Sequence, residues 1–211
     1  MFLRILACVV SGYLLGSVMS AVLISKLVYR EDVRKMGSGN SGATNAARVY
    51  GAFIGFATYF GDFLKCVLAC LLGRLIGGWN GDAARVCLAA AGAACILGHS
   101  FPVFFHFKGG KGVASGSGLA LMLDWRIFVI SICAFLIVTL ITKIVSAGSL
   151  AGCVSVAVCS AIFVRQPAAM ILAILSAILV ILMHWQNIDR LTKGQEKQFV
   201  FGKPRKPPRV K

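Results

Sequence analysis

Long apolar stretches recur along the chain, and short polar segments separate them. The stretches cover residues 2–28, 52–76, 83–105, 113–123, 126–144, 149–164 and 168–186. A helix needs about 20 apolar residues to cross ~30 Å of hydrocarbon, and several of these stretches approach that length. The pattern predicts an all-α integral membrane protein with seven transmembrane helices. The stretch 113–123 fits a full crossing least well, because it is short and its start is rich in glycine and serine.

Composition excludes the ordinary soluble classes. Of the 211 residues, 58% are apolar and only 14% are charged, against about 25% charged in soluble domains. A soluble globule of this size needs a charged coat, and this chain has too few charges to form one. The eight cysteines all fall in apolar stretches without CxxC pairing, so we interpret them as packing residues. We expect no metal and no cofactor.

The net charge is +15, and its distribution predicts the orientation. Most basic residues fall in the segments that would share one side of the membrane, and this side should be cytoplasmic. The N-terminus is then outside and the C-terminus cytoplasmic. We expect a membrane domain over residues 1–196 and a basic cytoplasmic tail over 197–211, which either rests on anionic lipid or is a solvated end. No nucleic acid is expected as a partner, since no basic face interleaved with aromatics lies outside the apolar stretches.

A first polar cluster lies in the loop 37–45, which Arg48 follows. Its three glycines let backbone N–H groups turn inward around an anion, and Arg48 adds a bidentate cation suited to phosphate. The cluster predicts a cradle for phosphate or acyl phosphate, with a flexible connecting loop as the alternative. Its candidate binding residues are Ser38, Asn40, Thr44, Asn45 and Arg48; Asn45 could instead cap the next helix.

A second cluster contains the string Gly109-Gly110-Lys111-Gly112 at the start of an apolar stretch. Backbone N–H groups, a helix N-terminus and an ammonium come together there, and all three favour phosphate. The spacing is not that of a P-loop, and the string alone is a weak signal.

A third cluster runs from His184 to Glu196. His184 and Asn187 are three residues apart, so they would share a helix face at the cytoplasmic end of the last span. Ser149, at the start of the sixth span, would face the same site. We interpret Glu196 as structural.

Two features inside the spans concern packing. Asp62 and Lys65 are three apart on the second span, and we interpret them as an internal ion pair that fixes helix packing, although charges within a membrane are also functional candidates. Gly12 and Gly16 on the first span predict a seam of close helix contact.

The three clusters match a known family. The strings GSGNSGATNAAR, GHSFPVFFHFKGGKGVAS and HWQNIDRLTKGQE resemble the three signature regions of the bacterial acyl-phosphate:glycerol-3-phosphate acyltransferases, the PlsY type. The match covers essentially the whole chain, although Ser41 stands where proline is common and Ser115 where threonine is common. The resemblance implies a seven-helix enzyme of the bacterial inner membrane, with its active site facing the cytoplasm. It would transfer a fatty acyl group from acyl phosphate to the sn-1 hydroxyl of glycerol 3-phosphate, giving lysophosphatidic acid and phosphate in the first acylation step of phospholipid synthesis.

The same resemblance, read with the chemistry of the residues, gives the expected site. The expected catalytic residues are Lys111, Arg48, His184 and Asn187, and the expected substrate-binding residues are Ser38, Asn40, Thr44, Asn45, Gly109, Gly110, Gly112 and Ser149. Acyl phosphate is already activated, so we expect direct attack by the glycerol hydroxyl without a covalent acyl-enzyme. The general base is either His184 or a substrate phosphate. His184 and Asp189 satisfy an HxxxxD spacing, but positions five apart on a helix diverge by about 140°, which argues against a dyad.

The main alternative is a membrane transporter or exchanger of phosphate-bearing metabolites. Basic clusters and an intramembrane ion pair would fit it, but the inverted repeats typical of such proteins are not found in the sequence. The expected partners are acyl phosphate, glycerol 3-phosphate and membrane lipid. The sequence leaves the acyl-chain preference and the oligomeric state open, and a monomer is compatible with it.

Overall fold

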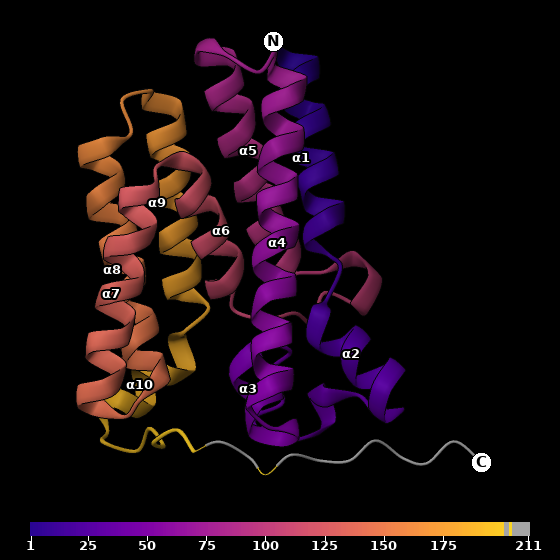
Figure 1. The fold of residues 1–211 in the computed structure, drawn as a ribbon, viewed down its shortest axis with the longest axis vertical. Coiled ribbons are helices and arrows are strands. Elements are labelled where there is room, and N and C mark those ends of the chain that lie inside the picture. The colour runs from indigo at the N-terminus through magenta and orange to yellow at the C-terminus, as the bar shows by residue number, and fades with distance from the viewer. Residues whose placement is uncertain (201–202, 204–211) are drawn as a thin grey trace.

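The computed structural model describes residues 1–200 and 203, and its regular elements in that part of the chain are all helices (Figure 1). Most of the predicted tail, 197–211, therefore lies outside the described residues. The helices are α1 (Phe2–Gly16), α2 (Ser20–Tyr29), η1 (Val33–Lys35), α3 (Ala43–Tyr50), α4 (Ala52–Gly77), α5 (Gly81–Ser100), η2 (Val103–Phe105), α6 (Val113–Leu123), α7 (Trp125–Thr142), α8 (Val145–Phe163), α9 (Pro167–Leu182) and α10 (Trp185–Thr192). The all-helical prediction is confirmed.

The long helices run between two ends of the molecule. Helices α1, α4 and α5 form one group, α7, α8 and α9 form another, and α6 lies between the groups (Figure 1). The N-terminus lies at one end, while the short helices α2, α3 and α10 gather at the other. That second end therefore carries loops from distant parts of the sequence.

Several helices have the length and apolarity of membrane spans. Within residues 1–200 and 203, four segments meet both criteria: Phe2–Tyr29, Gly81–Phe105, Trp125–Thr142 and Val145–Phe163. The bent pair of α9 and α10 would make a fifth. Helix α4 has 26 residues, about 39 Å at 1.5 Å per residue. Helix α6 has only 11, about 16 Å, so it is much shorter than the hydrocarbon core.

The first apolar stretch, expected as one helix over 2–28, is broken after Gly16. The break leaves backbone groups without helical partners, and two charged residues of α4 satisfy them. Lys65 Nζ donates to the carbonyls of Gly16 (2.9 Å) and Val18 (2.5 Å). Asp62 Oδ1 accepts from the backbone N–H of Ser20 at 3.5 Å and from Ser20 Oγ at 2.9 Å. The two side chains pair at 2.9 Å, which confirms the predicted internal ion pair and shows that it holds the ends of α1 and α2 together.

A close seam joins α1 to α5, as the spacing of Gly12 and Gly16 predicts. A Cβ added at Gly12 would lie 2.3 Å from the carbonyl oxygen of Ala91, and one added at Gly16 would lie 2.1 Å from that of Cys95. Both distances are far below van der Waals contact. The two helices can approach this closely only because neither position carries a side chain.

Gly16→Ala is expected to lower the unfolding temperature in detergent, because the added methyl group must push α1 away from α5. Overpacking of this kind costs about 1–3 kcal/mol. Gly116→Ala in α6 is the matched control: no atom lies within 4 Å of its added Cβ, and alanine favours the helix by about 0.5–1 kcal/mol. Equal unfolding temperatures for the two variants would contradict the seam.

Candidate active site

A network of polar side chains joins the second and third clusters at one end of the bundle. Lys111, in the loop before α6, donates to Asn187 Oδ1 of α10 at 2.5 Å. Asn187 Nδ2 donates to Glu196 Oε1 at 2.6 Å, and Ser146 Oγ of α8 donates to the same oxygen at 2.7 Å. Arg190 Nε donates to Glu196 Oε2 at 2.5 Å. Glu196 is thus the centre that ties α8, α10 and the Lys111 loop together.

The site carries more positive than negative charge. Burial is the main cause that lowers the pKa of Lys111, from 10.5 to about 8; Glu196 opposes the shift, and the charges of Arg190 and Arg48 add to it. Burial alone would raise the pKa of Glu196, but hydrogen bonds from Arg190, Ser146 and Asn187 lower it below its usual 4.5. At neutral pH Lys111, Arg190 and Arg48 bring three cations within electrostatic reach of one another, against the single carboxylate of Glu196, and such a site attracts anions.

His184 is buried where the chain bends by 57° between α9 and α10. Its Nδ1 lies 2.7 Å from the carbonyl oxygen of Val180. A carbonyl only accepts, so Nδ1 carries the proton, and Nε2 is left as an acceptor. The charges of Lys111 and Glu196 both act on the ring, which places His184 at the same site. Asp189 instead pairs with Lys193 at 2.9 Å.

Asn45 braces the first loop from the inside. Its side chain is 1% exposed and donates to the carbonyls of Val33, Met36 and Asn40, while its oxygen accepts from the backbone N–H of Ser38 at 2.8 Å. It lies within α3, whose N-cap is Gly42, so the cap interpretation of Asn45 is wrong. Its amide is committed to the loop backbone.

The other predicted residues of the first cluster lie around this brace. Arg48 is half-buried on α3, its guanidinium lies 6.0 Å from the ring centre of Phe199, and its charge reaches Lys111. Ser38 is exposed and Thr44 is half-buried. Ser149 is buried on α8, and its hydroxyl donates to the carbonyl of Val145 in its own helix at 2.9 Å.

The glycines before α6 let the loop lie directly on the end of α5. A Cβ at Gly109 would lie 2.1 Å from the carbonyl oxygen of His99, and one at Gly110 would lie 2.3 Å from His99 Nε2. The N–H of Gly110 donates to that carbonyl at 3.0 Å. Gly112 has φ +90°, a conformation that favours glycine. The string therefore fixes the position of Lys111, and the Gly110 N–H is already engaged within the protein.

The sequence does not identify two members of the network, Ser146 and Glu196, as site residues. Ser146 carries no motif of its own. Glu196, which the sequence suggests is structural, does hold the network together. It also contacts Asn187 and acts on the charge of Lys111, so it belongs to the candidate site itself. The available signal is that Asn187, Arg190 and Glu196 are polar residues spaced closely around one helix end in a largely apolar chain.

The fold is that of a helical membrane protein, and the comparisons with known proteins show that its family is one of membrane acyltransferases. A profile of the family described as "Glycerol-3-phosphate acyltransferase" matches residues 6–194. The chain therefore belongs to the glycerol-3-phosphate acyltransferase family.

Particular relatives agree along nearly the whole chain. The chain is 40% identical to the glycerol-3-phosphate acyltransferase of Finegoldia magna, over 88% of this chain and 91% of that protein. It is also 40% identical to the one from Synechococcus elongatus, over 93% and 95%. Among solved structures it resembles PlsY (YgiH), an integral membrane glycerol 3-phosphate acyltransferase, in its glycerol 3-phosphate form, with a TM-score of 0.85 and 35% identity over 93% of this chain and 96% of that one. The lysophosphatidic acid form of PlsY gives a TM-score of 0.83 at 34% identity, over 93% and 95%.

Proposed function

We propose that the protein transfers a fatty acyl group from acyl phosphate to the sn-1 hydroxyl of glycerol 3-phosphate, releasing lysophosphatidic acid and phosphate. The observation that carries the proposal is the meeting of Lys111, Arg48 and Arg190 around His184 and Asn187 at one end of an apolar bundle. Both substrates bear phosphate, and a cation-rich site suits two phosphates. The bundle supplies an apolar environment for the acyl chain.

In the proposed reaction, the glycerol oxygen attacks the acyl carbonyl carbon and the bond from that carbon to the phosphate oxygen breaks. Phosphate is a good leaving group, so no acyl-enzyme is needed. Lys111 and Arg48 hold the phosphates and stabilise the negative charge that develops in the transition state. Asn187 orients Lys111 through its Oδ1. The hydroxyl proton goes to Nε2 of His184 or to a substrate phosphate.

We further propose that residues 1–196 form a domain with seven spans in the bacterial inner membrane: α1 with α2, then α4, α5, α6, α7, α8 and α9. Helix α6 counts as a span here although its 11 residues are too few to cross the hydrocarbon by themselves. The N-terminus is outside and the site faces the cytoplasm. This orientation is supported by the basic residues near the site end of the bundle, among them Lys26, Arg34, Lys108 and Lys143. Labelling of a C-terminal tag in intact cells tests it: a tag that reacts from outside would overturn the orientation.

The activity test uses the purified protein in lipid nanodiscs with acyl phosphate and glycerol 3-phosphate. Equal amounts of inorganic phosphate and 1-acylglycerol 3-phosphate should form. Acyl phosphate without glycerol 3-phosphate controls for simple hydrolysis. If the folded protein forms no acylated product, the proposal is wrong; uptake of glycerol 3-phosphate into sealed vesicles would then favour the transporter.

The pH dependence should report Lys111. With a pKa of about 8, the ammonium is mostly charged at pH 7 and mostly neutral at pH 9, while a phosphate monoester, with its second pKa near 6, stays doubly charged. We expect kcat/KM for glycerol 3-phosphate to fall about tenfold from pH 7 to pH 9. Lys111→Arg should flatten this decline, because arginine stays protonated. An unchanged profile in that variant would assign the decline to another group.

A further inference from the structure

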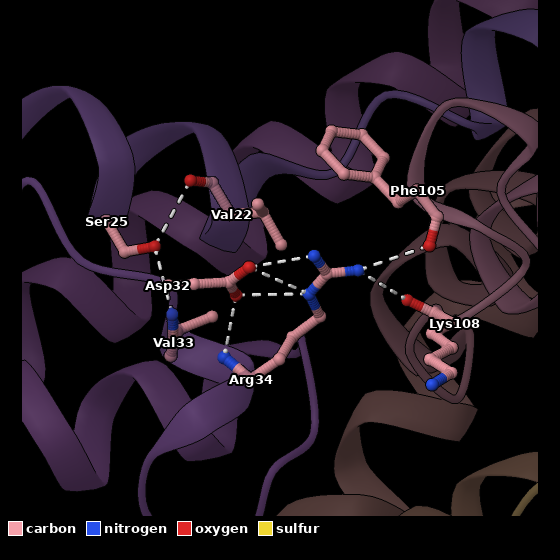
Figure 2. Close-up of polar contacts among 7 residues, drawn as sticks. All are labelled: Val22, Ser25, Asp32, Val33, Arg34, Phe105 and Lys108. Carbon is pink, nitrogen blue, oxygen red and sulfur yellow. Dashed lines mark hydrogen bonds and ion pairs between the residues drawn. The ribbon is translucent and has the colours of Figure 1, made fainter.

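One arginine outside the network, in the segment just before the loop 37–45, connects that segment to the turn before Gly109. Arg34 lies in η1, and its guanidinium extends from Asp32 to the turn that follows α5 (Figure 2). Its Nη1 donates to the carbonyls of Phe105 (3.2 Å) and Lys108 (3.3 Å). These contacts join residues more than 70 positions apart in the sequence.

Asp32 orients this guanidinium. Its carboxylate accepts from Arg34 Nε at 3.0 Å and from Nη2 at 2.7 Å, and also from the backbone N–H of Arg34 at 3.0 Å. A guanidinium has five N–H donors in a fixed plane. The carboxylate and the two carbonyls engage all three nitrogens, and the carboxylate balances the charge. Arg34 is therefore built to hold backbone rather than to receive a substrate phosphate.

The backbone that Arg34 holds is strained. His106 and Phe107 have φ values of +56° and +57°, a left-handed conformation that residues with a Cβ avoid. The two carbonyls that Arg34 binds belong to Phe105 and Lys108, on either side of this pair. The guanidinium thus joins both ends of the unfavourable turn.

The turn leads directly into the loop that carries Lys111. Gly109 follows Lys108, and both Gly109 and Gly110 lie against His99 of α5. The segment 105–110 is thereby held by Arg34 at its start and by His99 at its end. A shift of the turn that moves Gly109 and Gly110 on His99 also moves Lys111, because only Gly110 separates Gly109 from it.

We propose that Arg34 is a positioning residue for the acyl transfer: together with Asp32 it holds the turn 105–108 and so sets the place of Lys111 for the phosphate of glycerol 3-phosphate. The inference rests on the proposed function for its kinetic part only. A lysine at position 34 cannot replace the arginine, because a single ammonium lacks the planar fork that binds a carboxylate and two carbonyls at once.

The chain offers a matched control. Asp124 and Arg126 form the same local arrangement, with Asp124 accepting from the backbone N–H of Arg126 at 2.9 Å, from Nε at 2.9 Å and from Nη2 at 2.7 Å. This pair begins α7, away from the site, and Arg126 lies over the ring of Phe163 at 4.2 Å. Arg126→Met removes an equivalent charge and local bond without touching the turn.

The experiment compares Arg34→Met, Arg34→Lys and Asp32→Asn with Arg126→Met in the full-length protein. For the two Arg34 variants we expect KM for glycerol 3-phosphate to rise roughly tenfold or more, with KM for acyl phosphate and the unfolding temperature close to wild type. Asp32→Asn should change KM in the same direction, and it keeps the test available if Arg34→Met does not fold. Equal rises in both KM values, or Arg34 variants that match Arg126→Met, would overturn the proposal.

Hydrogen exchange of residues 103–112 gives a readout that needs no activity. The amides of this segment should exchange faster in Arg34→Met than in wild type and stay unchanged in Arg126→Met. If wild type forms no product but the exchange result holds, the proposed function fails and the positioning of the turn by Arg34 stands. Unchanged exchange in Arg34→Met would reject the positioning role.

Discussion

Replacing Lys111 with methionine is expected to lower kcat/KM for glycerol 3-phosphate by about a thousandfold. Methionine keeps an unbranched side chain of similar length but removes the ammonium from a site where burial strengthens its interaction with anions. Loss of one such preorganised donor costs about 10²–10³ in rate, and loss of a ground-state contact to phosphate adds to it. Phosphate release measured over a range of glycerol 3-phosphate concentrations gives the value.

Lys108→Met is the matched control for this variant. Lys108 is an exposed residue of the same loop, so the change removes an equal charge three positions away and should leave kcat/KM within about threefold of wild type, as surface charges act weakly. Lys111→Arg should retain part of the activity. If Lys111→Met keeps wild-type kinetics while the protein is folded, Lys111 is not a catalytic residue.

Lys65→Met is expected to destabilise the folded protein by about 3–5 kcal/mol, because it leaves the buried Asp62 without its ammonium partner, with only Ser20 and His99 beside the carboxylate. It also removes the donor that Gly16 and Val18 use at the break between α1 and α2. For a chain of this size the loss corresponds to a fall of about 10 °C or more in unfolding temperature. Thermal unfolding in one detergent, followed by tryptophan fluorescence, measures it.

Asp82→Asn provides the comparison. Asp82 pairs with Arg85 at 3.5 Å across the same i,i+3 spacing, but its side chain is 76% exposed, so the pair contributes little. The double variant Asp62→Asn with Lys65→Met should lose less stability than the sum of the two single changes, since no lone charge remains. Equal unfolding temperatures for Lys65→Met and Asp82→Asn would contradict the role assigned to the pair.

The long helices could be predicted from hydrophobic length because that pattern reports what must be kept from water. The breaks after Gly16 and Leu182 could not. Hydropathy adds up the apolar character of the side chains. A helix break depends instead on whether the backbone groups that it frees find hydrogen-bond partners elsewhere in the fold. At Gly16 the partner is Lys65, 49 residues away in the sequence, and nothing in the first apolar stretch signals it.

The polar clusters predicted which residues the structure brings together at one end of the bundle, but not which contacts each of them makes. Asn45 and Gly110 stand in motifs that are typical of phosphate binding. Yet the side-chain amide of Asn45 and the backbone N–H of Gly110 are both hydrogen-bonded to the protein's own backbone. Glu196 and Arg34 are the opposite case: neither was predicted as a site residue from the sequence, yet each connects distant segments around the site. The pattern Asp-x-Arg occurs at 32–34 and again at 124–126, and only the fold shows that the first copy reaches a second loop.

The bend at His184 couples the site to its surroundings. It turns α10 away from α9, so that Trp185 is 70% exposed while Asn187, two residues later, is 6% exposed. In a bilayer, such an aromatic residue settles among the lipid headgroups. One short helix therefore turns Trp185 outward and holds Lys111 through Asn187. If the proposed orientation holds, the packing of lipid headgroups around Trp185 bears on the position of Lys111.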